Sequence, residues 1–308
     1  MNITVTVLCL TYNQAGCIRE ALEGFVAQRP PFAFEVLVHD DASTDGTADI
    51  VREYEVRYPA LIRGVYQQQN QYSQGVFIAR EFLFPLIRGR YVALCEGDDY
   101  WTDPDKLAKQ VAALEAHPEL DICSHRALCI RGGAPHGYVA PRLRDAVIPA
   151  GEVILEGGNA FATASLLCRR DVYMRQTPMR DVLVNDYVLQ MQGSLRGGML
   201  YLDDCMSVYR MDTPGSWTGK HGRWLDDDHR KLLNRMLDAL DAYTDGAWHR
   251  EITLRKRIYD SNSLLASHRY AALLAPGEIG TTLQRLRLDA VRDWRKLCLW
   301  LRKMKNLQ

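Results

Sequence analysis

The sequence predicts an α/β protein with a mostly parallel central sheet and a helical C-terminal region. Over the first 118 residues, short apolar runs alternate with amphipathic stretches, which is the rhythm of strands and helices in a parallel sheet. Each apolar run ends in polar residues, as strands do where they border a ligand crevice. From residue 224 onward the pattern has helical periodicity without strand signals.

The first part of the chain alternates predicted strands with predicted helices. Apolar runs rich in β-branched residues indicate the strands, and apolar residues at helical spacing indicate the helices. The expected strands are 3–10, 34–39, 61–66 and 91–95, and the expected helices are 16–28, 46–58 and 75–88. Because parallel strands end at the same edge of a sheet, the polar residues that follow them should meet at one crevice.

The next elements are indicated by capping residues, glycines and apolar runs. Asp103 and Pro104 suit the N-cap and the first position of a helix that runs to about residue 117. The Gly/Pro-rich stretch 131–158 predicts loops with a strand or two. The last elements expected before the C-terminal region are an apolar run at 161–168, a helix at 182–195 and a strand at 199–210.

The composition is that of an ordinary folded protein without a surface for nucleic acid. The 308 residues carry 38 basic and 38 acidic side chains, 47% are hydrophobic and 25% are charged. Eight cysteines without a C-x-x-C pair, several of them inside apolar runs, indicate reduced and buried thiols. The sequence shows no signal-peptide pattern and no apolar run of the roughly 18 residues that span a bilayer. We therefore expect a cytoplasmic protein.

Polar residues at the ends of the second and fourth strands carry the chemistry. The absence of G-x-G-x-x-G and G-x-x-x-x-G-K-[ST] motifs disfavours dinucleotide and P-loop binding. Asp40 and Asp41 end the second strand, where a carboxylate can accept hydrogen bonds from a base or a ribose, and residues 43–47 are expected to cap the next helix. The segment 96–99, Glu-Gly-Asp-Asp, offers only oxygen ligands. Such ligands suit Mg²⁺ or Mn²⁺ shared with substrate phosphates.

Three of these segments, in this order and spacing, resemble the family 2 glycosyltransferases of the GT-A fold. Residues 5–13, 38–47 and 96–101 are similar to the family's nucleotide loop, base-binding aspartate segment and D-x-D-type metal motif. The resemblance covers about the first 210 residues. It implies a catalytic domain at 1–222, with a nucleotide-binding half at 1–118 and an acceptor half at 119–222, and a helical C-terminal region at 223–308.

The resemblance implies a nucleotide pocket made by six residues, of which Asp98 also belongs to the metal site described below. Thr11, Tyr12 and Asn13 would line it, and Asp41 would meet the base. Arg80 stands where similar enzymes place a nucleotide-contacting arginine, so it would reach the pyrophosphate, unless it is simply an exposed helix residue. A UDP-sugar is the donor that the resemblance favours.

The resemblance also implies a metal site and a loop that closes over the donor. Asp98 would contact the ribose or a phosphate-bound ion, and Asp99 would coordinate Mn²⁺ or Mg²⁺. Glu96 stands where many relatives have Asp, which leaves open which of the three acids touches the ion. Arg210 would neutralise the pyrophosphate as charge builds on it. The Q-x-x-R-W motif of processive polysaccharide synthases is absent, which favours addition of a single sugar.

An inverting transfer needs one carboxylate to take the proton of the acceptor hydroxyl. Residues 184–189 resemble the family's E-D-Y segment at the start of a helix, with Asn185 replacing the usual acid and Asp186 standing at the position of the base. A charge that complements the helix dipole is the alternative role of Asp186. Asp181 is the nearest competing carboxylate.

We therefore expect an inverting, metal-assisted glycosyltransferase that acts on a glycan or lipid-linked glycan. Two alternatives are a sugar-nucleotide pyrophosphorylase and a non-catalytic module that binds a nucleotide or a glycan. A pyrophosphorylase should carry a Gly-rich, basic loop after the first strand, and residues 11–16 lack one. A binding module would not need Asp99 and Asp186 together.

The C-terminal stretch 281–308 is amphipathic and basic. Apolar residues recur there at helical spacing, and eight basic residues stand against two acidic ones. Such a helix can lie in an anionic membrane interface, which would suit a lipid-linked acceptor and a location at the inner face of the membrane. Packing on the catalytic domain and pairing of two subunits into a homodimer are the alternatives.

Overall fold

A mixed sheet forms the centre of the structure, a computed structural model that describes residues 2–181, 185–211, 213, 227–266 and 283. Within these residues the sheet has ten strands. The strand order is β3 (Ile62–Tyr66), β2 (Phe34–Asp40), β1 (Val5–Thr11), β4 (Tyr91–Leu94), β9 (Leu167–Arg169), β6 (Ile122–Arg131), β10 (Met199–Met211) and β5 (Tyr100–Trp101), with β7 (Ala134–Val139) on β6 and β8 (Ala146–Ile148) on β10. The first four strands of this order are parallel, as are β6 and β10.

The register of the parallel strands brings their polar ends together. Val5 of β1 lies opposite Phe34 of β2 on one side and Tyr91 of β4 on the other. Thr11 at the end of β1 pairs with Asp40 at the end of β2. The segments that follow these strands therefore emerge at one edge of the sheet, as the sequence predicts.

Helices cover both faces of the sheet. One face packs on α1 (Ile18–Val26), α2 (Thr47–Arg57) and α3 (Lys106–Ala116). The other face packs on α4 (Ala150–Glu156), α5 (Arg170–Met174), α6 (Asn185–Ser194) and the turns η2 (Ala79–Leu83) and η3 (Phe84–Leu86). Six of the seven described cysteines are buried in this interior, and all seven are free thiols.

The prediction of a single helix at 75–88 is wrong. The chain instead forms a 3₁₀ turn η1 (Tyr72–Gln74), the π-helical turn η2 and the 3₁₀ turn η3. Gly75 ends the first turn with φ of 74°, a left-handed conformation that favours glycine. Pro85 has no N–H to donate, so it suits the start of the short turn η3 and interrupts the hydrogen-bond pattern of a continuous α-helix.

Two other boundaries differ from the sequence prediction. Helix α3 begins at Lys106 rather than at residue 104, because the Asp103 carboxylate accepts a hydrogen bond from the backbone N–H of Asp105 (2.8 Å) and forms a turn before the helix. The stretch 131–158 contains the strands β7 and β8, which agrees with the prediction of loops with a strand or two, but it also contains the helix α4, which was not predicted. Gly132 and Gly133, with φ of 54° and 79°, make the tight turn between β6 and β7.

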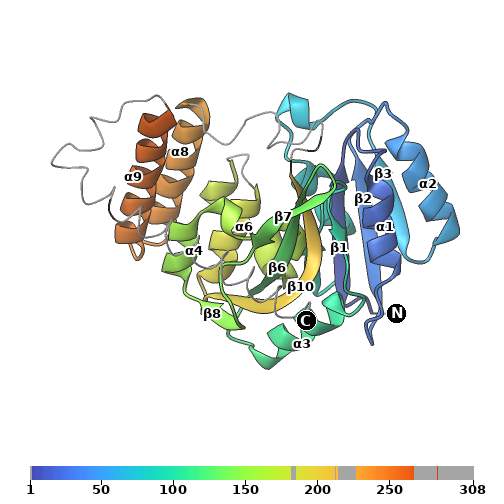
Figure 1. The fold of residues 1–308 in the computed structure, drawn as a ribbon, viewed down its shortest axis with the longest axis horizontal. Helices are drawn as coiled ribbons and strands as arrows, with labels where there is room; N and C mark the ends of the chain where they lie inside the picture. The colour runs from blue at the N-terminus through green and yellow to red at the C-terminus, as the bar shows by residue number, and fades with distance from the viewer. Residues whose placement is uncertain (1, 182–184, 212, 214–226, 267–282, 284–308) are drawn as a thin grey trace.

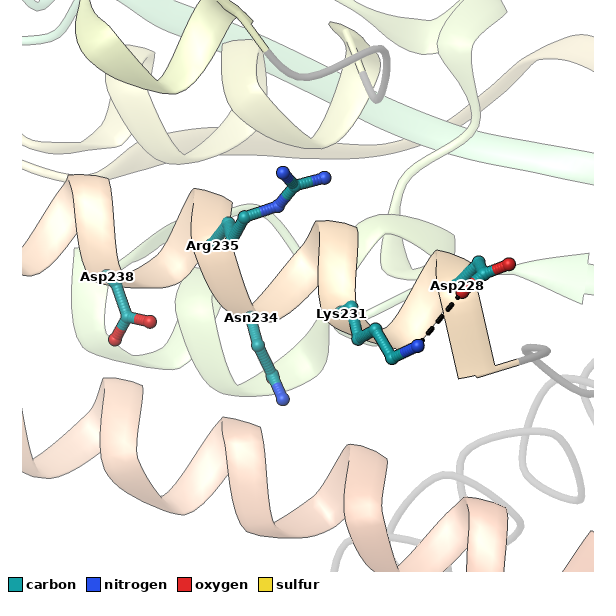
Figure 2. Close-up of a pocket in the computed structure, with 5 residues that line it drawn as sticks. All are labelled: Asp228, Lys231, Asn234, Arg235 and Asp238. Atoms are coloured by element: carbon teal, nitrogen blue, oxygen red, sulfur yellow. Dashed lines mark hydrogen bonds and ion pairs between the residues drawn. The ribbon is translucent and has the colours of Figure 1, made fainter.

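The C-terminal region contributes two described helices, α8 (Asp227–Tyr243) and α9 (His249–Ala266), which lie side by side at the end of the molecule opposite α2 (Figure 1). They share an apolar cluster with α4 and α6. The polar side of α8 lines a groove with Asp228, Lys231, Asn234, Arg235 and Asp238 (Figure 2). Apart from Leu283, the predicted amphipathic stretch 281–308 lies outside the described residues. No described helix is long and apolar enough to cross a bilayer.

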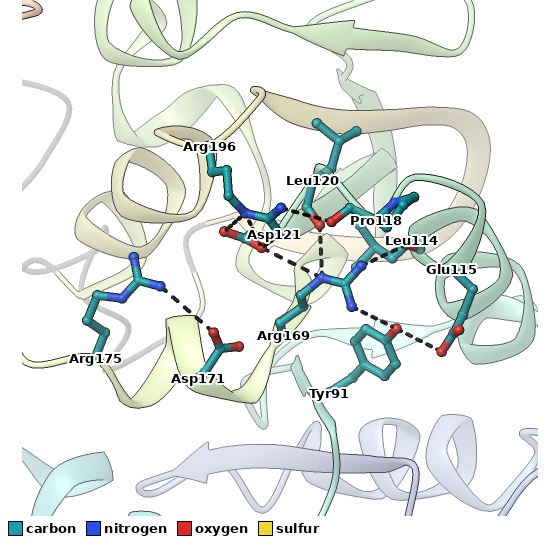
Figure 3. Close-up of polar contacts among 10 residues, drawn as sticks. All are labelled: Tyr91, Leu114, Glu115, Pro118, Leu120, Asp121, Arg169, Asp171, Arg175 and Arg196. Carbon is teal, nitrogen blue, oxygen red and sulfur yellow. Dashed lines mark hydrogen bonds and ion pairs between the residues drawn. The ribbon is translucent and has the colours of Figure 1, made fainter.

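A cluster of ion pairs and hydrogen bonds stabilises the end of the sheet that lies opposite the acid-bearing strand ends (Figure 3). Asp121 directly precedes β6 and is almost fully buried. Its carboxylate accepts hydrogen bonds from Arg196 (3.0 Å) and lies 3.6 Å from the Arg169 guanidinium. Arg169 also donates to the carbonyls of Leu114 and Leu120, both at 3.0 Å, and so ties α3 to β6 and β9.

Candidate active site

The acid segment, residues 96–99, follows β4 and lies against the loop after β1. Asp98 and Asp99 are only 9% and 1% exposed. Gly97 allows this close approach, because a Cβ atom there would lie 2.5 Å from Gln14 Oε1 and 2.8 Å from Thr11 Oγ1. The structure therefore joins the predicted metal segment to the predicted nucleotide loop.

One oxygen of Asp99 is held and the other is without a partner. Oδ1 accepts a hydrogen bond from the backbone N–H of Arg210 (2.8 Å). Oδ2 is buried and has no hydrogen-bond partner in the described structure. Burial, and then repulsion by Asp98, hold the pKa of Asp99 well above its usual range. A bound cation would satisfy both the orphaned oxygen and the excess of negative charge.

The neighbouring acids are also perturbed. Burial raises the pKa of Asp98, although a hydrogen bond from the Gln14 side chain and the charge of Arg210 oppose that effect. Glu96 has an exposed side chain, and the enclosing protein, followed by repulsion from Asp98 and Asp186, raises its pKa to about 8. Three carboxylates that repel one another stand where a hard cation fits.

The described residues do not form a complete metal site by themselves. Among them, no group of three or more His, Cys, Asp or Glu side chains is arranged to hold an ion. This agrees with the chemistry of Mg²⁺, which binds through one or two carboxylates and completes its coordination with water and substrate phosphates. The Asp98 and Asp99 pair fits an ion shared with a diphosphate.

Asp186 lies in the first turn of α6, and its charge adds to the upward shift of the Glu96 pKa. Its Oδ1 accepts a hydrogen bond from the backbone N–H of Tyr187 (2.7 Å), and burial raises its pKa. Tyr187 anchors this end of the helix through its hydroxyl, which donates to the Ile154 carbonyl (2.6 Å). The side chain of the competing Asp181 lies outside the described residues.

The loop after β1 is hydrogen-bonded to the loop after β2. Asn13 has φ of 51°, its N–H donates to Ser43 Oγ (2.9 Å), and its Oδ1 accepts from the Thr44 N–H (2.8 Å). Thr11 is buried, whereas Tyr12 is 38% exposed and free to contact a ligand. These bonds hold the two predicted nucleotide segments as one surface.

Residues 43–47 lead into α2, but its N-cap is Gly46, which makes no side-chain capping bond, and not Ser43, Thr44 or Asp45 as the sequence suggests. The Asp45 carboxylate accepts a hydrogen bond from the Thr47 N–H (3.0 Å) at the start of α2. Its second oxygen accepts from the Ala15 N–H (2.9 Å) in the loop after β1. Asp45 therefore supports the first residue of α2 from just outside the helix and also braces the nucleotide loop.

Asp41 is buried and its carboxylate is engaged by backbone. One oxygen accepts from the N–H of Gln71 (2.8 Å) and the other from the N–H of Tyr72 (3.0 Å). The side chain thereby holds the loop after β3 beside the strand ends. Arg80, on η2, is half-exposed, pairs with Glu81 at 3.1 Å and lines a groove of about 450 Å³ that also includes Gln71.

Arg210 lies against the acid segment. Its Nη1 donates to the Asp98 carbonyl (2.6 Å), its guanidinium stacks on Tyr100 at 4.7 Å from the ring centroid, and its Nη2 pairs with the Glu20 carboxylate. Sequence reasoning missed Gln14 and Glu20 as partners of these residues. Gln14 could have been predicted because it directly follows the nucleotide loop in sequence. The sequence around Glu20 gives no indication that it meets Arg210.

Comparison with known proteins identifies the family. The sequence profile of Glycosyl transferase family 2 matches residues 6–143. An uncharacterised protein of Mycobacterium tuberculosis is 37% identical over 250 residues, which cover 78% of this chain and 70% of that protein. The chain belongs to glycosyltransferase family 2. The prediction of a glycosyltransferase is thereby confirmed, in preference to a pyrophosphorylase or a non-catalytic module.

Named and solved relatives agree with this assignment. The UDP-Glc:alpha-D-GlcNAc-diphosphoundecaprenol beta-1,3-glucosyltransferase WfaP of Escherichia coli is 29% identical over 111 residues, 36% of this chain and 41% of its own. TarS 1–349 of S. aureus in complex with UDP-GlcNAc superposes with a TM-score of 0.65 at 16% identity, over 92% of this chain and 80% of TarS. The mannosyltransferase PcManGT of Pyrobaculum calidifontis, with GDP-Man and Mn²⁺, has a TM-score of 0.54 at 20% identity, over 96% and 88%. The GT-A fold is confirmed.

Proposed function

We propose that the enzyme transfers one sugar from a UDP-sugar to a hydroxyl of a surface glycan or lipid-linked glycan, with inversion at the anomeric carbon. The observation that supports this proposal is the position of Asp186 in the first turn of α6, near enough to Glu96 for its charge to raise the Glu96 pKa, so that a candidate base lies near the candidate donor site. The UDP-GlcNAc bound to TarS supports a UDP donor. The name of WfaP supports a UDP-sugar and a diphospholipid-linked acceptor.

Asp186 is the proposed general base. It accepts the proton of the acceptor hydroxyl while that oxygen attacks the anomeric carbon from the face opposite the leaving diphosphate. Burial raises its pKa toward the working pH, which strengthens a carboxylate as a base. Its hydrogen bond from the Tyr187 N–H fixes the carboxylate while leaving Oδ2 available to the acceptor.

Asp99 and Asp98 are the residues that would hold Mn²⁺ or Mg²⁺. Such an ion, when bound, supplies positive charge for the leaving diphosphate. The Arg210 backbone N–H orients Asp99, and the unpartnered Oδ2 of Asp99 is the atom that fits the ion. The Mn²⁺ bound to PcManGT supports this role.

The remaining site residues are proposed to hold the nucleotide. Tyr12 is exposed enough to stack on the base, and Thr11 and Asn13 shape the loop beneath it. Asp41 acts on the base side by holding the loop after β3. Arg80 faces the groove there and contributes to binding the pyrophosphate.

Arg210 is proposed to reach the pyrophosphate of the donor. Its guanidinium is paired with Glu20 in this structure, so that pair must open before a phosphate can take its place. Removing Glu20 in a Glu20→Gln variant should therefore favour donor binding. Unchanged UDP affinity in that variant would restrict Arg210 to its contacts with the acid segment.

A thermal-shift panel tests the donor proposal. UDP, dTDP and GDP are compared with and without Mn²⁺, and a ligand at 100 times its Kd adds about 2.7 kcal/mol of stability. We expect UDP with Mn²⁺ to give the largest shift and excess EDTA to cancel the metal-dependent part. Asp228→Asn on α8 is a matched control that should leave the shift unchanged. Absence of a shift with every nucleotide would reject the proposal.

The basic stretch 281–308 is proposed to bring the enzyme to a membrane that carries the acceptor. Each basic residue near an anionic surface adds about 1 kcal/mol of attraction. Co-sedimentation with anionic vesicles at low salt, compared between the full chain and a chain ending near residue 280, tests this role. Equal binding by both chains would favour packing or dimer formation through that stretch.

A further inference from the structure

Lys106 is a fully buried lysine behind the acid segment. Its Nζ donates to Gln110 Oε1 at 2.7 Å and lies 4.0 Å from the centroid of the Trp101 ring. In the part of the chain that the structure describes, no carboxylate forms an ion pair with it. Lys109, three residues further along α3, pairs with both Asp103 (2.8 Å) and Asp204 (3.1 Å).

The position of Lys106 is costly for an ammonium group. It is the first residue of α3, where the helix dipole repels positive charge, and burial removes its water. Burial lowers the pKa of Lys106 to about 7, against smaller upward effects of Cys95, Cys123 and Asp103, and the neutral His125 faces it from β6. A protonated lysine that loses its water needs compensating contacts, and Gln110 Oε1 and the Trp101 ring provide them.

Both partners of Lys106 also form a hydrogen bond to the same turn in the second half of the chain. Trp101 Nε1 donates to the Ala164 carbonyl (2.9 Å), and Gln110 Nε2 donates to the Ser165 carbonyl (2.8 Å). These carbonyls belong to the 3₁₀ turn η5 (Thr163–Ser165). One ammonium therefore organises two hydrogen bonds between elements that are about 60 residues apart in sequence.

Trp101 also connects this cluster to the acids. It directly continues the acid segment as part of β5, where it pairs with Ser207 of β10. The Leu94 N–H, just before the acid segment, donates to the Leu166 carbonyl (3.1 Å), just after η5. The acid segment is thus attached to η5 at both of its ends.

We propose that Lys106 is a positioning residue that fixes the acid segment against the acceptor half of the enzyme by holding Trp101 and Gln110 on η5. Its effect on the donor site rests on the proposed function of the acids, whereas its effect on the segment itself does not. The ammonium attracts the face of the Trp101 indole and donates to the Gln110 amide oxygen. The orientation of each partner then sets its own hydrogen bond to η5.

Hydrogen exchange in the protein without ligands tests the structural step. In Lys106→Met, amide exchange should accelerate both at Thr102, whose N–H bonds to the Met206 carbonyl, and at Ser165 and Leu166 within and after η5. Lys109→Met, which alters an exposed lysine of the same helix, should leave these peptides protected. Unchanged exchange in a folded Lys106→Met or Lys106→Gln variant overturns the proposal.

Donor binding tests the consequence for the site. We expect UDP affinity in the presence of Mn²⁺ to fall about 10-fold or more in Lys106→Met. Glu96 ionises near pH 8 in both proteins, so the readout is the difference between their pH profiles: the weakening of UDP affinity between pH 7 and 8 that comes from deprotonation of Lys106 should be lost in Lys106→Met. Faster exchange with unchanged affinity and an unchanged pH profile would reduce Lys106 to a structural role and reject positioning. If the unaltered enzyme binds no UDP, the proposed function fails, and the exchange experiment still decides the structural step.

Discussion

The free energy of unfolding should rise with pH above neutrality because of Lys106. Its pKa is 10.5 in an unfolded chain and about 7 in the folded protein, where burial disfavours the ammonium. Between these values the unfolded chain binds a proton that the folded chain has released. Stability therefore increases with pH in this window and is lowest below pH 7. Lys106→Met removes the contribution.

The size of the effect follows from the lowered pKa of Lys106. A pKa of about 7 against 10.5 corresponds to about 5 kcal/mol of stability. The unfolded chain keeps its proton over most of the range from pH 7 to 10, whereas the folded chain loses it. We therefore expect a rise of about 3.5 kcal/mol between pH 7 and 10, or a little more than about 1 kcal/mol for each pH unit.

Urea unfolding at pH 7, 8, 9 and 10 and constant ionic strength measures this rise. The relevant quantity is the difference between unaltered protein and Lys106→Met, because cysteines and tyrosines titrate in both. Lys109→Met is the control: Asp103 raises the pKa of Lys109, so its stabilising contribution is fully present up to the unfolded pKa of 10.5 and is constant over this range. Curves for Lys106→Met that run parallel to those of the unaltered protein would refute the reasoning.

Three further substitutions separate chemistry from stability. Asp186→Asn should lower turnover about 10²-fold with UDP affinity unchanged, measured by product formation and calorimetry, and near-normal turnover would direct attention to Asp181. Asp99→Asn should lower turnover about 10²-fold or more. It should not lower the melting temperature, because the repulsion between Asp99 and Asp98 is removed, and a melting temperature several degrees lower would contradict that account. Asp121→Asn should cost about 3 kcal/mol in urea unfolding with UDP binding intact, whereas a loss of UDP binding in the folded variant would disprove the separation.

The parts of the fold that depend on local pattern could be predicted from sequence. Strands β1, β2, β3 and β4 agree with their expected ranges because each is a short, mainly apolar run, and β1, β2 and β4 are almost entirely buried. The region 72–86 could not be predicted, because its apolar spacing is helical while Gly75 and Pro85 divide it into turns. Periodicity reports which residues face the core, and it does not report where the backbone breaks.

The site shows the same division. The acids at 96–99 were predictable because they are contiguous and follow a strand. The proximity of Asp186 to Glu96 depends on the packing of α6, so sequence could suggest it only through family resemblance. Lys106 was missed because a lysine in the first turn of a helix is normally solvated, and its burial arises from Trp101 and Gln110, which close over it only in the folded chain.

Helix α1 touches the strand that continues the acid segment without an intervening side chain. A Cβ atom at Gly24 would lie 2.8 Å from the Trp101 carbonyl oxygen, so the two backbones are in direct contact. One turn earlier, Glu20 of the same helix holds Arg210. Segments between strands usually move independently of the elements around them. Here the acids share the stiffness of a nine-residue helix, so a displacement of α1 moves the carboxylates of the acid segment as well instead of being absorbed by loop flexibility.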